Sequence, residues 1–333
     1  MAKPLKVGLA CNIKASSPLD PGSGPPDADA EFDDLDTVHA IQDALSAGGH
    51  QVSIYEATAD LPLMLINDRP DIVFNIAEGV NGRGREAHVP AILSFLGIPF
   101  TGSDETTMCI TIDKALTKRL LATYGVLSPN SQLVTSPDQA IDQALTYPLI
   151  VKPNAEGSSK GISDLSVANS FGELRQIIHE KIDTYRQALL VEEYIAGREF
   201  TVGILGNGDQ LRVFTPMEVI FTDQDHQIYS YQVKRNFQRY IEYKSPPDID
   251  PGLMGKMMDT AEKVFRTLEC RDCSRIDFRL SDSGDLYFIE INPLPGLAPG
   301  YSDYPMLAGF NGVDYVPLVQ AILDSALKRY NMS

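Results

Sequence analysis

The first hundred residues alternate between strand-like and helix-like stretches, and this alternation limits the possible folds more than any other feature of the chain. The strand-like stretches are KVGLAC, QVSIYEA and DIVFNIA. Between the first two, apolar residues recur at helical spacing over 35–45, and Gly48 and Gly49 end this helix. A second helix is expected over 89–96. This β-α-β order predicts a parallel sheet with helices on its faces.

The rest of the chain is richer in strands. A GSD linker at 102–104 leads to a helical segment at 111–125, and LIVKP and LLVEEYI flank a helix at 171–187. EFTVGILG, a helix near 252–268, the strands RIDFRL and LYFIEIN and a closing helix near 315–330 follow. The 333 residues are too many for one compact core. We therefore predict an α/β N-terminal domain followed by α+β domains.

The charge of the chain excludes some partners. The net charge is −17, from 28 Lys and Arg against 45 Asp and Glu, so phosphates would be repelled over most of the surface. No apolar run approaches the ~20 residues that cross a bilayer. The N-terminus lacks the long apolar stretch of a signal peptide. We therefore expect a cytoplasmic protein that binds neither nucleic acid nor membranes.

The four cysteines are Cys11, Cys109, Cys270 and Cys273. The last two form a C-x-x-C, which occurs in redox pairs and as half of a zinc site. A zinc site needs about two more ligands at related spacing, and none appears. We therefore predict reduced, structural cysteines.

Two strand-like stretches near the C-terminus bring polar side chains together. In SRIDFRL, Arg275 and Asp277 are two residues apart, so they share one face of a strand. Glu290 and Asn292 do the same in YFIEIN, and the intervening SDSGD predicts a hairpin that would gather all four side chains. Their oxygens suit Mg²⁺, and the arginine suits a phosphate or an oxyanion. An exposed polar face with one salt bridge would give the same pattern.

The segment VKPNAEGSSKGI at 151–162 ends a strand and opens a loop of small residues. Small residues let backbone N–H groups approach phosphate oxygens, and Lys152 and Lys160 add positive charge. A surface loop would have the same composition. The GSSKG run also fits the G-x-S-x-G elbow of serine hydrolases, but no strand enters it directly and no helix follows at once. We therefore do not expect a hydrolase.

Acidic and basic residues elsewhere suggest a nucleotide site. Glu192 and Glu193 end one strand-like stretch and Glu199 opens the next. These acids could accept hydrogen bonds from an adenine amino group and from ribose hydroxyls, or could be solvated charges at strand ends. Lys234 and Arg235 are either an exposed pair or part of a lid that closes on phosphates.

Taken in order, these stretches resemble the ATP-grasp superfamily and, within it, the D-alanine–D-alanine ligase family. The matching segments, weaker before residue 70, are TGSD, DKALTKRLL, VKP with EGSSKGI, VEEYIAGREFTVGILG, VKR, RIDFRL and FIEINPLPGL. The resemblance implies an ATP-grasp fold with an N-terminal Rossmann-like domain at 1–103, a central lobe at 104–196 and a C-terminal lobe at 197–333. It also implies a homodimer that binds ATP and two Mg²⁺ ions, which Mn²⁺ could replace.

The resemblance also assigns roles to residues. Those implied to bind ATP are Lys114, Lys152, Ser159, Glu192, Glu193, Tyr194, Ile195, Glu199 and Lys234. Asp277 and Glu290 would hold one Mg²⁺ ion, and Glu290 and Asn292 the second. Arg275 and the backbone of Gly296 would stabilise a tetrahedral oxyanion.

Some residues depart from the family pattern, and they concern the substrate. A longer acidic segment replaces the family's glycine-rich early loop, and Glu31 is the candidate anchor for the first substrate's ammonium, with Asp33 and Asp34 as alternatives. Ser158 matches the loop serine that helps to place this substrate. Arg235 stands where a tyrosine usually couples to that serine, so it either meets an extra anionic group on a substrate or pairs with a nearby acid.

The acceptor side also differs. A Thr-Ser-Pro-Gly run usually follows the asparagine, whereas this chain has PLPG. Ser302 falls where the family's carboxylate-binding serine lies, if one inserted residue is allowed.

The resemblance implies a reaction of two steps. One substrate's carboxylate attacks the γ-phosphoryl of ATP to give an acyl phosphate and ADP, and a second substrate's amine then displaces phosphate. We therefore predict an ADP-forming carboxylate–amine ligase for two small amino acids, with D-alanine as the default substrate. A ligase for a different amino acid or dipeptide-like product is the first alternative, and a nucleotide-binding protein without turnover is the second.

Overall fold

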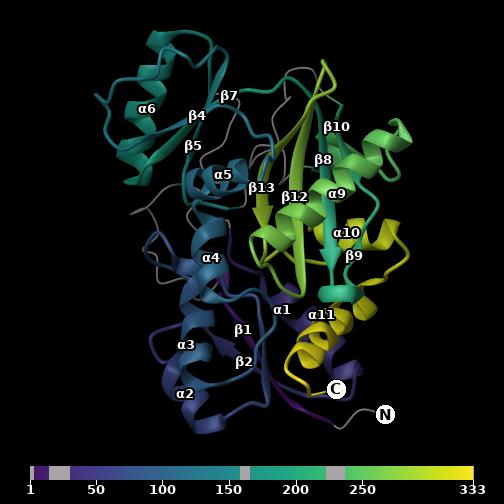
Figure 1. Cartoon of the computed structure of the whole chain (residues 1–333). Coiled ribbons are helices and arrows are strands. Elements are labelled where there is room, and N and C mark those ends of the chain that lie inside the picture. The colour runs from purple at the N-terminus through teal and green to yellow at the C-terminus, as the bar shows by residue number, and fades with distance from the viewer. Residues whose placement is uncertain (1–3, 15–30, 158–165, 223–236, 333) are drawn as a thin grey trace.

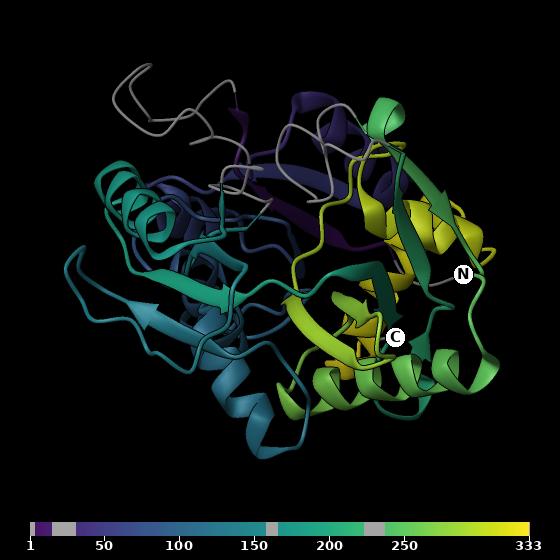
Figure 2. The ribbon, with the colours of Figure 1, turned by 90° about the horizontal axis from the view of Figure 1, so that it is seen from above.

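The computed structural model of the chain describes residues 4–14, 31–157, 166–222 and 237–332. Three β-sheets with helices on their faces make up this part of the chain (Figure 1). The parallel sheet lies at one end, and the other two sheets lie side by side beyond it, as Figure 2 shows from above. One parallel and two antiparallel sheets confirm the predicted combination of α/β and α+β parts.

The parallel sheet follows the predicted alternation. Its strands pair in the order β2-β1-β3, and they are β1 (Lys6–Cys11), β2 (Gln51–Glu56) and β3 (Ile72–Asn75). One face packs on α1 and the other on α2 and α3, with a short 3-10 helix η2 before α3. These helices are α1 (Leu35–Ala47), α2 (Leu61–Asp68), η2 (Arg85–Ala87) and α3 (His88–Leu96). Gly48 caps α1, as predicted, and Gly49 follows with a φ of +85°.

The helical segment predicted at 111–125 is in fact two helices, α4 (Glu105–Ile112) and α5 (Lys114–Thr123). The single-helix prediction was wrong because Asp113 has an extended backbone and caps a new helix. Its carboxylate accepts the backbone N–H of Leu116 at 3.0 Å. The break places Lys114 at the very start of α5.

The second sheet is antiparallel, with the order β4-β7-β5-β6. Helix α6 packs against it through buried Leu174 and Ile178. The elements are β4 (Ser131–Val134), β5 (Leu149–Pro153), β6 (Val167–Ala168), α6 (Phe171–Tyr185) and β7 (Leu189–Glu193).

The third sheet has the order β11-β10-β8-β12-β13, and β9 pairs with β8. Helix α9 covers one face with a stripe of apolar residues that includes Met257, Ala261 and Val264. The strands are β8 (Gly197–Leu205), β9 (Arg212–Val213), β10 (Met217–Phe221), β11 (Ile241–Lys244), β12 (Cys273–Ser281) and β13 (Leu286–Asn292). The helices are η4 (Gly208–Gln210), α8 (Phe237–Tyr240) and α9 (Pro251–Thr267).

The last two helices return to the N-terminal sheet. Helix α11 (Tyr315–Arg329) shares an apolar core with α1 and β1, and the Gln320 amide donates to the Ala44 carbonyl at 3.2 Å. Helix α10 (Asp303–Phe310) joins this core to the third sheet through the Tyr304 hydroxyl, which donates to the Ile204 carbonyl at 2.8 Å. One apolar core therefore contains residues from both ends of the chain. The division into domains at residues 103 and 196 stays a prediction.

All four cysteines are free thiols, as expected for structural cysteines. Burial raises the pKa of the Cys270 thiol to about 12, so this half of the C-x-x-C is unreactive. No cluster of three His, Cys, Asp or Glu side chains suited to a metal occurs in the part of the chain that the structure describes.

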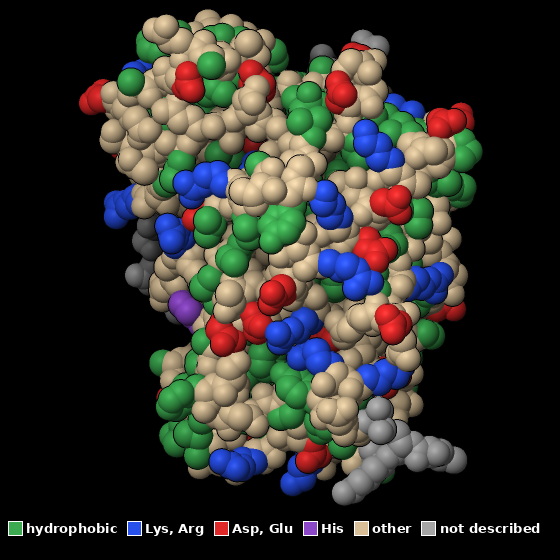
Figure 3. Space-filling view, viewed as in Figure 1, with side chains coloured by type: hydrophobic (Ala, Val, Ile, Leu, Met, Phe, Trp, Pro, Cys, Tyr) green, Lys and Arg blue, Asp and Glu red, His purple; other side chains and the backbone are tan. Residues whose placement is uncertain are grey.

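The surface is mixed in charge. Lys and Arg side chains lie scattered among Asp and Glu on the face shown in Figure 3. Within the described ranges no single helix is long and apolar enough to cross a membrane, although α10 and α11, bent by 102°, together meet the criteria of length and composition.

Candidate active site

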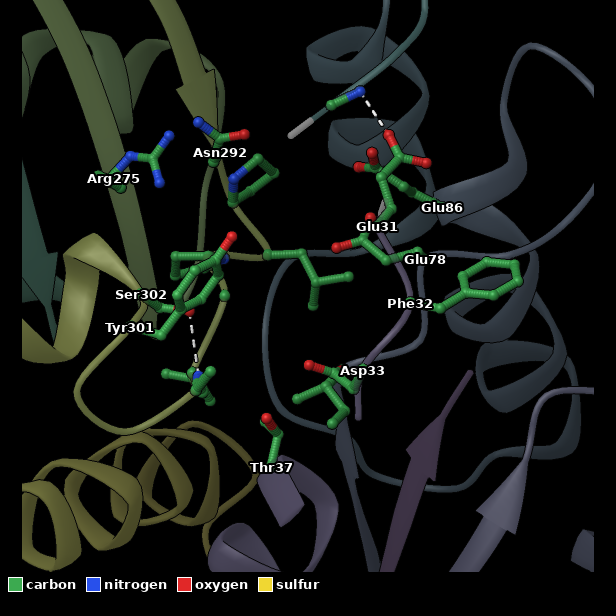
Figure 4. Close-up of a pocket in the computed structure, with 18 of the residues that line it drawn as sticks. Glu31, Phe32, Asp33, Thr37, Glu78, Glu86, Arg275, Asn292, Tyr301 and Ser302 are labelled. Atoms are coloured by element: carbon green, nitrogen blue, oxygen red, sulfur yellow. Dashed lines mark hydrogen bonds between the residues drawn. The ribbon is translucent and has the colours of Figure 1, made fainter. Parts of the chain in front are cut away.

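A cavity of about 920 Å³ opens between the N-terminal sheet, the start of α5 and the end of β13. Figure 4 shows the polar side chains that converge on it. Its wall includes Glu31 and Glu78 from the N-terminal part, Lys114 from α5, and Arg275 and Asn292 from the third sheet. Ligand pockets for small molecules commonly have this size.

The hairpin of β12 and β13 forms one side of the site. The strands pair so that Arg275 is opposite Asn292 and Asp277 is opposite Glu290. The two-residue spacings and the SDSGD turn predict the hairpin that brings these four side chains together, but not this register. The pairing register shifts directly after Asp277, as at a β-bulge.

Arg275 is held by two carboxylates. Its Nη2 lies 2.9 Å from Asp277 Oδ2, and its Nη1 lies 3.3 Å from Asp303 Oδ2. Burial opposes the charge of this guanidinium, but the two aspartates outweigh burial and raise the pKa of Arg275. A fixed, fully charged guanidinium suits a phosphate or a developing oxyanion. The sequence did not point to Asp303, which is the first residue of α10.

Glu290 is ionised by its surroundings. Lys114 Nζ lies 3.4 Å from Glu290 Oε2 and also donates to the backbone carbonyl of Glu156. Burial opposes ionisation of Glu290, but Lys114, Lys152 and Arg275 outweigh it and lower the pKa of the carboxyl to about 2. A carboxylate with this pKa is available as a metal ligand at any physiological pH.

Three oxygen-bearing side chains of the hairpin fit a hard cation. Asp277 and Glu290 supply carboxylate oxygens, and Asn292, opposite Arg275 on the same hairpin, supplies an amide oxygen. Two carboxylates and an amide are too few for a resident metal cage. They match Mg²⁺, which completes its shell with water and substrate phosphates. The residues therefore fit Mg²⁺ that arrives with a nucleotide.

A buried triad of charges lies between α5 and the second sheet. Glu192 Oε1 is 2.5 Å from Lys152 Nζ, and Glu192 Oε2 is 2.9 Å from Lys118 Nζ. None of the three is more than 3% exposed. Burial lowers the pKa of Lys118 to about 8, although Glu192 acts in the opposite direction. Lys118 was not predicted, but its position one helical turn after Lys114 in DKALTKRLL is a signal for it.

Glu193 lies apart from Glu192, because neighbouring residues of a strand face opposite sides. Its carboxylate accepts the backbone N–H of Thr146 at 2.9 Å and the Thr146 hydroxyl at 2.6 Å. Asn130 Nδ2 donates to it at 2.9 Å. Glu193 therefore fastens the loop before β5 to the end of β7.

Arg279 gathers three of the residues expected near the nucleotide. Its guanidinium lies 2.8 Å from Glu199 Oε2 and donates to the Ile195 carbonyl at 2.9 Å. It also lies over the Tyr194 ring, 5.0 Å from the centroid. Arg279 was not predicted, although it comes two residues after Asp277 and thus shares its face of β12, which pairs regularly with β8 over these residues.

Glu31 is buried and already engaged. Arg85 Nη2 donates to both of its carboxylate oxygens at 2.7 Å, and the Gly157 N–H donates to Oε1. Arg85 was not predicted. Of the two alternative anchors, Asp34 pairs with Lys14 at 3.2 Å, and burial raises the pKa of Asp33 to about 7.

Two further carboxylates, Glu78 and Glu86, line the same end of the cavity. Neither was predicted from the sequence. Glu78 follows the strand-like DIVFNIA directly, and ligands of parallel sheets bind at the carboxyl ends of the strands. This position directly after a predicted strand was the signal in the sequence that could have identified Glu78 as a site residue.

Gly296 and Ser302 meet at the opposite end of the cavity. A Cβ on Gly296 would lie 2.8 Å from Ser302 Oγ, so no larger residue fits without displacing the serine. Ser302 Oγ accepts the backbone N–H of Ala298 at 3.1 Å. Pro293 and Leu294 line the cavity beside them, so this wall is apolar. Ser158, Ser159, Lys234 and Arg235 lie outside the described residues.

Comparisons with known proteins agree with this arrangement. A family model described as the D-ala D-ala ligase C-terminus matches residues 122–324. An uncharacterized protein, y4sG, of Sinorhizobium fredii is 32% identical over 98% of this chain and 98% of its own length. D-alanine–D-alanine ligases of Sphingopyxis alaskensis and Aquifex aeolicus are 32% and 33% identical, over 86% and 87% of this chain and 91% and 94% of theirs.

A solved structure shares the fold. The D-alanine–D-alanine ligase from Bacillus anthracis, complexed with ATP, superposes with a TM-score of 0.74 at 18% sequence identity. The match covers 98% of this chain and 99% of that one.

Proposed function

The chain belongs to the D-alanine–D-alanine ligase family, and from this premise we propose that it joins two small amino acids with ATP, through an acyl phosphate. The observation that carries the proposal is the β12–β13 register, which sets Asp277 against Glu290 and Arg275 against Asn292. Arg275, Glu290 and Asn292 line the cavity, and Asp277 lies behind them in contact with Arg275. This arrangement offers cation ligands and an oxyanion partner within one site.

ATP would lie between the second and third sheets. The group around Arg279, with Tyr194, Ile195 and Glu199, supports an adenosine site there. The triad of Lys118, Glu192 and Lys152 would close the nucleotide pocket from the side of α5. Lys114, at the start of α5, would meet the phosphates, because its Nζ lies 3.4 Å from Glu290, which would hold the Mg²⁺ of the nucleotide.

Mg²⁺ would be held by Asp277, Glu290 and Asn292, and when bound it would neutralise charge on the transferred phosphoryl group. Arg275 would hold the acyl group, and with the backbone of Gly296 it would stabilise the oxyanion formed when the amine attacks. Ser302, fixed by the Ala298 N–H, would orient the carboxylate of the second substrate. The apolar wall of Pro293 and Leu294 would keep water from the acyl phosphate.

The identity of the two amino acids is the finer part of the proposal. D-alanine is the first candidate for both positions, because the named relatives are D-alanine–D-alanine ligases. A different amino acid is the second candidate, because Pro293 and Leu294 replace small hydroxyl residues beside the acceptor site. We further propose a homodimer that works in the cytoplasm, where ATP is available.

The test is phosphate release from the protein with ATP and Mg²⁺, first with D-alanine and then with a panel of amino-acid pairs. We expect release only when amino acids are present, with a dipeptide as the second product. Arg275→Met is the matched inactive variant, because it removes the oxyanion partner while leaving the carboxylates of the hairpin. If no amino-acid pair leads to phosphate release, the ligase proposal is contradicted, and a protein that only binds nucleotide is favoured.

A further inference from the structure

Three carboxylates face the same space at the acidic end of the cavity. Glu31 precedes α1, Glu78 follows β3, and Glu86 lies in η2, and Figure 4 shows them turned toward one another. Gly79 makes this possible, since its φ is +75° and a Cβ there would lie 2.3 Å from the Arg85 carbonyl oxygen. The loop therefore packs Glu78 tightly against the turn that carries Glu86.

One of the three carboxylates is already neutralised. Glu31 accepts two hydrogen bonds from Arg85 and one from the Gly157 N–H. Arg85 also donates to the Ala155 carbonyl at 2.6 Å and lies 3.1 Å from Glu156 Oε2. The guanidinium thus contacts two carboxylates directly, Glu31 and Glu156, and forms no ion pair with Glu78 or Glu86.

Glu78 and Glu86 have no such partner. Neither makes a hydrogen bond or an ion pair with any residue in the described ranges, although Glu86 is only 8% exposed. The three cations that line the described cavity wall each pair with another carboxylate: Lys14 with Asp34, Lys114 with Glu290 and Arg275 with Asp277. Glu86 is buried and Glu78 is half-buried, and a carboxylate in such surroundings without a partner is costly, so a cation from outside the described residues would stabilise both.

The surrounding charges explain how the pair behaves without that cation. Burial raises the pKa of Glu86 to about 7, with Arg85 and Lys114 acting against this rise and Glu31 and Glu156 adding to it. Burial, Glu86, Glu31 and Asp33 raise the pKa of Glu78, while Arg85 lowers it. The pair therefore holds a proton near neutral pH that an incoming cation would displace.

The chemistry of the two substrates decides which of them brings the cation. The acceptor amine must be unprotonated to attack an acyl carbon, so a cluster of carboxylates would hold it in the wrong form. The amino acid whose carboxylate is activated keeps its α-ammonium group throughout both steps. A cationic group at this end of the cavity therefore belongs to the acyl donor.

We propose that Glu78 and Glu86 together bind the α-ammonium group of the acyl donor, and so set the preference for an amino acid over a hydroxy acid of the same shape. Glu31 does not bind the ammonium group in this proposal, because its carboxylate is paired with Arg85. The inference rests on the proposed ligase function and names the residues that recognise one of its substrates.

The test measures the donor half-reaction with hydroxylamine as a general nucleophile, by hydroxamate formation from D-alanine and from D-lactate. If the amino-acid panel identifies another donor, that amino acid and its α-hydroxy counterpart replace them. We expect Glu78→Gln and Glu86→Gln each to lower the ratio of kcat/KM for the amino acid over the hydroxy acid by roughly 10- to 100-fold. Glu180→Gln, on the exposed face of α6, is the control and leaves the ratio unchanged.

Other outcomes would overturn the proposal. An equal loss for both donors would mean a structural role, and a collapse of the ratio in Glu31→Gln alone would restore Glu31 as the anchor. Because Gln replaces a charge that has no ion-pair partner among the described residues, we expect the Tm of both variants at pH 8 to stay the same or to rise. If the unaltered protein forms no hydroxamate from any donor, the ligase function fails instead, so the two failures are distinguishable.

The pH dependence gives a second readout. The ionised pair binds the ammonium group, so KM for the donor should fall roughly tenfold between pH 6 and pH 8, as a group with a pKa of about 7 loses its proton. Glu86→Gln should flatten this profile. A profile that stays as steep in the variant would show that another group titrates.

Discussion

Substitution of Arg85 should lower the free energy of unfolding strongly although it changes the volume of the side chain little. Its guanidinium joins η2 of the N-terminal part to the second sheet, through Glu31, Glu156 and the Ala155 carbonyl. The Arg85 side chain is 6% exposed, and those of Glu31 and Glu156 are 3% and 12% exposed. Arg85→Met keeps most of the apolar stem and removes only the charge and the donors.

The contacts set the expected size of the effect. Removing one partner of a buried ion pair leaves an uncompensated charge, which typically costs about 3 to 5 kcal/mol. Arg85→Met removes from Glu31 its ion pair with the guanidinium and the two hydrogen bonds that its carboxylate accepts from Arg85 Nη2. We therefore expect a loss of about 3 to 5 kcal/mol in the free energy of unfolding, of which Glu31→Gln in the same chain recovers about 2 kcal/mol.

Urea unfolding followed by circular dichroism measures this loss. Arg266→Met is the matched control, because Arg266 pairs with Glu262 on the exposed side of α9, where the two side chains are 50% and 39% exposed. An exposed pair of this kind contributes about 0.5 kcal/mol or less. If Arg85→Met costs no more than Arg266→Met, the buried network does not hold the two parts together.

Three further predictions concern the site and the thiols. Gly296→Ala should lower kcat by roughly 100-fold with little change in stability, because the new Cβ would lie 2.8 Å from Ser302 Oγ and shift the acceptor site. Steady-state kinetics would measure the change in kcat, and a urea titration would measure the stability. Glu199→Gln should raise KM for ATP roughly tenfold and leave kcat unchanged, because it weakens the pair with Arg279 at the nucleotide site; an unchanged KM would place the nucleotide elsewhere. Cys109 alone should react with a thiol reagent in the folded protein, and the other three cysteines only after unfolding, because they are buried; a second rapid thiol would contradict this.

The features that the sequence predicts well are local. The hairpin of β12 and β13 follows from the period of a strand and from a short turn, both of which lie within one segment. The pairing of Arg275 with Asn292 also needs the register shift after Asp277, which the sequence does not show. The β-α-β order of the N-terminal sheet is likewise a matter of neighbouring segments. The prediction of a single helix at 111–125 was wrong at Asp113. This aspartate ends one helix and caps the next, and the sequence pattern alone does not distinguish such a cap from a residue inside a helix.

The features that cannot be predicted from the sequence depend on contacts between residues far apart in the chain. Arg85 lies 54 residues from Glu31 and 71 from Glu156, and no periodicity joins them. Glu78 and Glu86 were not predicted, because only the fold brings the segment after β3 and η2 to the same cavity. The burial that makes these carboxylates informative is a property of the packed chain alone.

The acyl phosphate is the centre of the account, and oxygen transfer tests it most directly. An amino-acid donor carrying ¹⁸O in its carboxylate is turned over with ATP, Mg²⁺ and the acceptor, and the released phosphate is analysed by mass spectrometry. If the carboxylate attacks the γ-phosphoryl group, one labelled oxygen appears in each phosphate that accompanies a dipeptide. Dipeptide formation with unlabelled phosphate would contradict the account, because the carboxylate would then have been activated in another way.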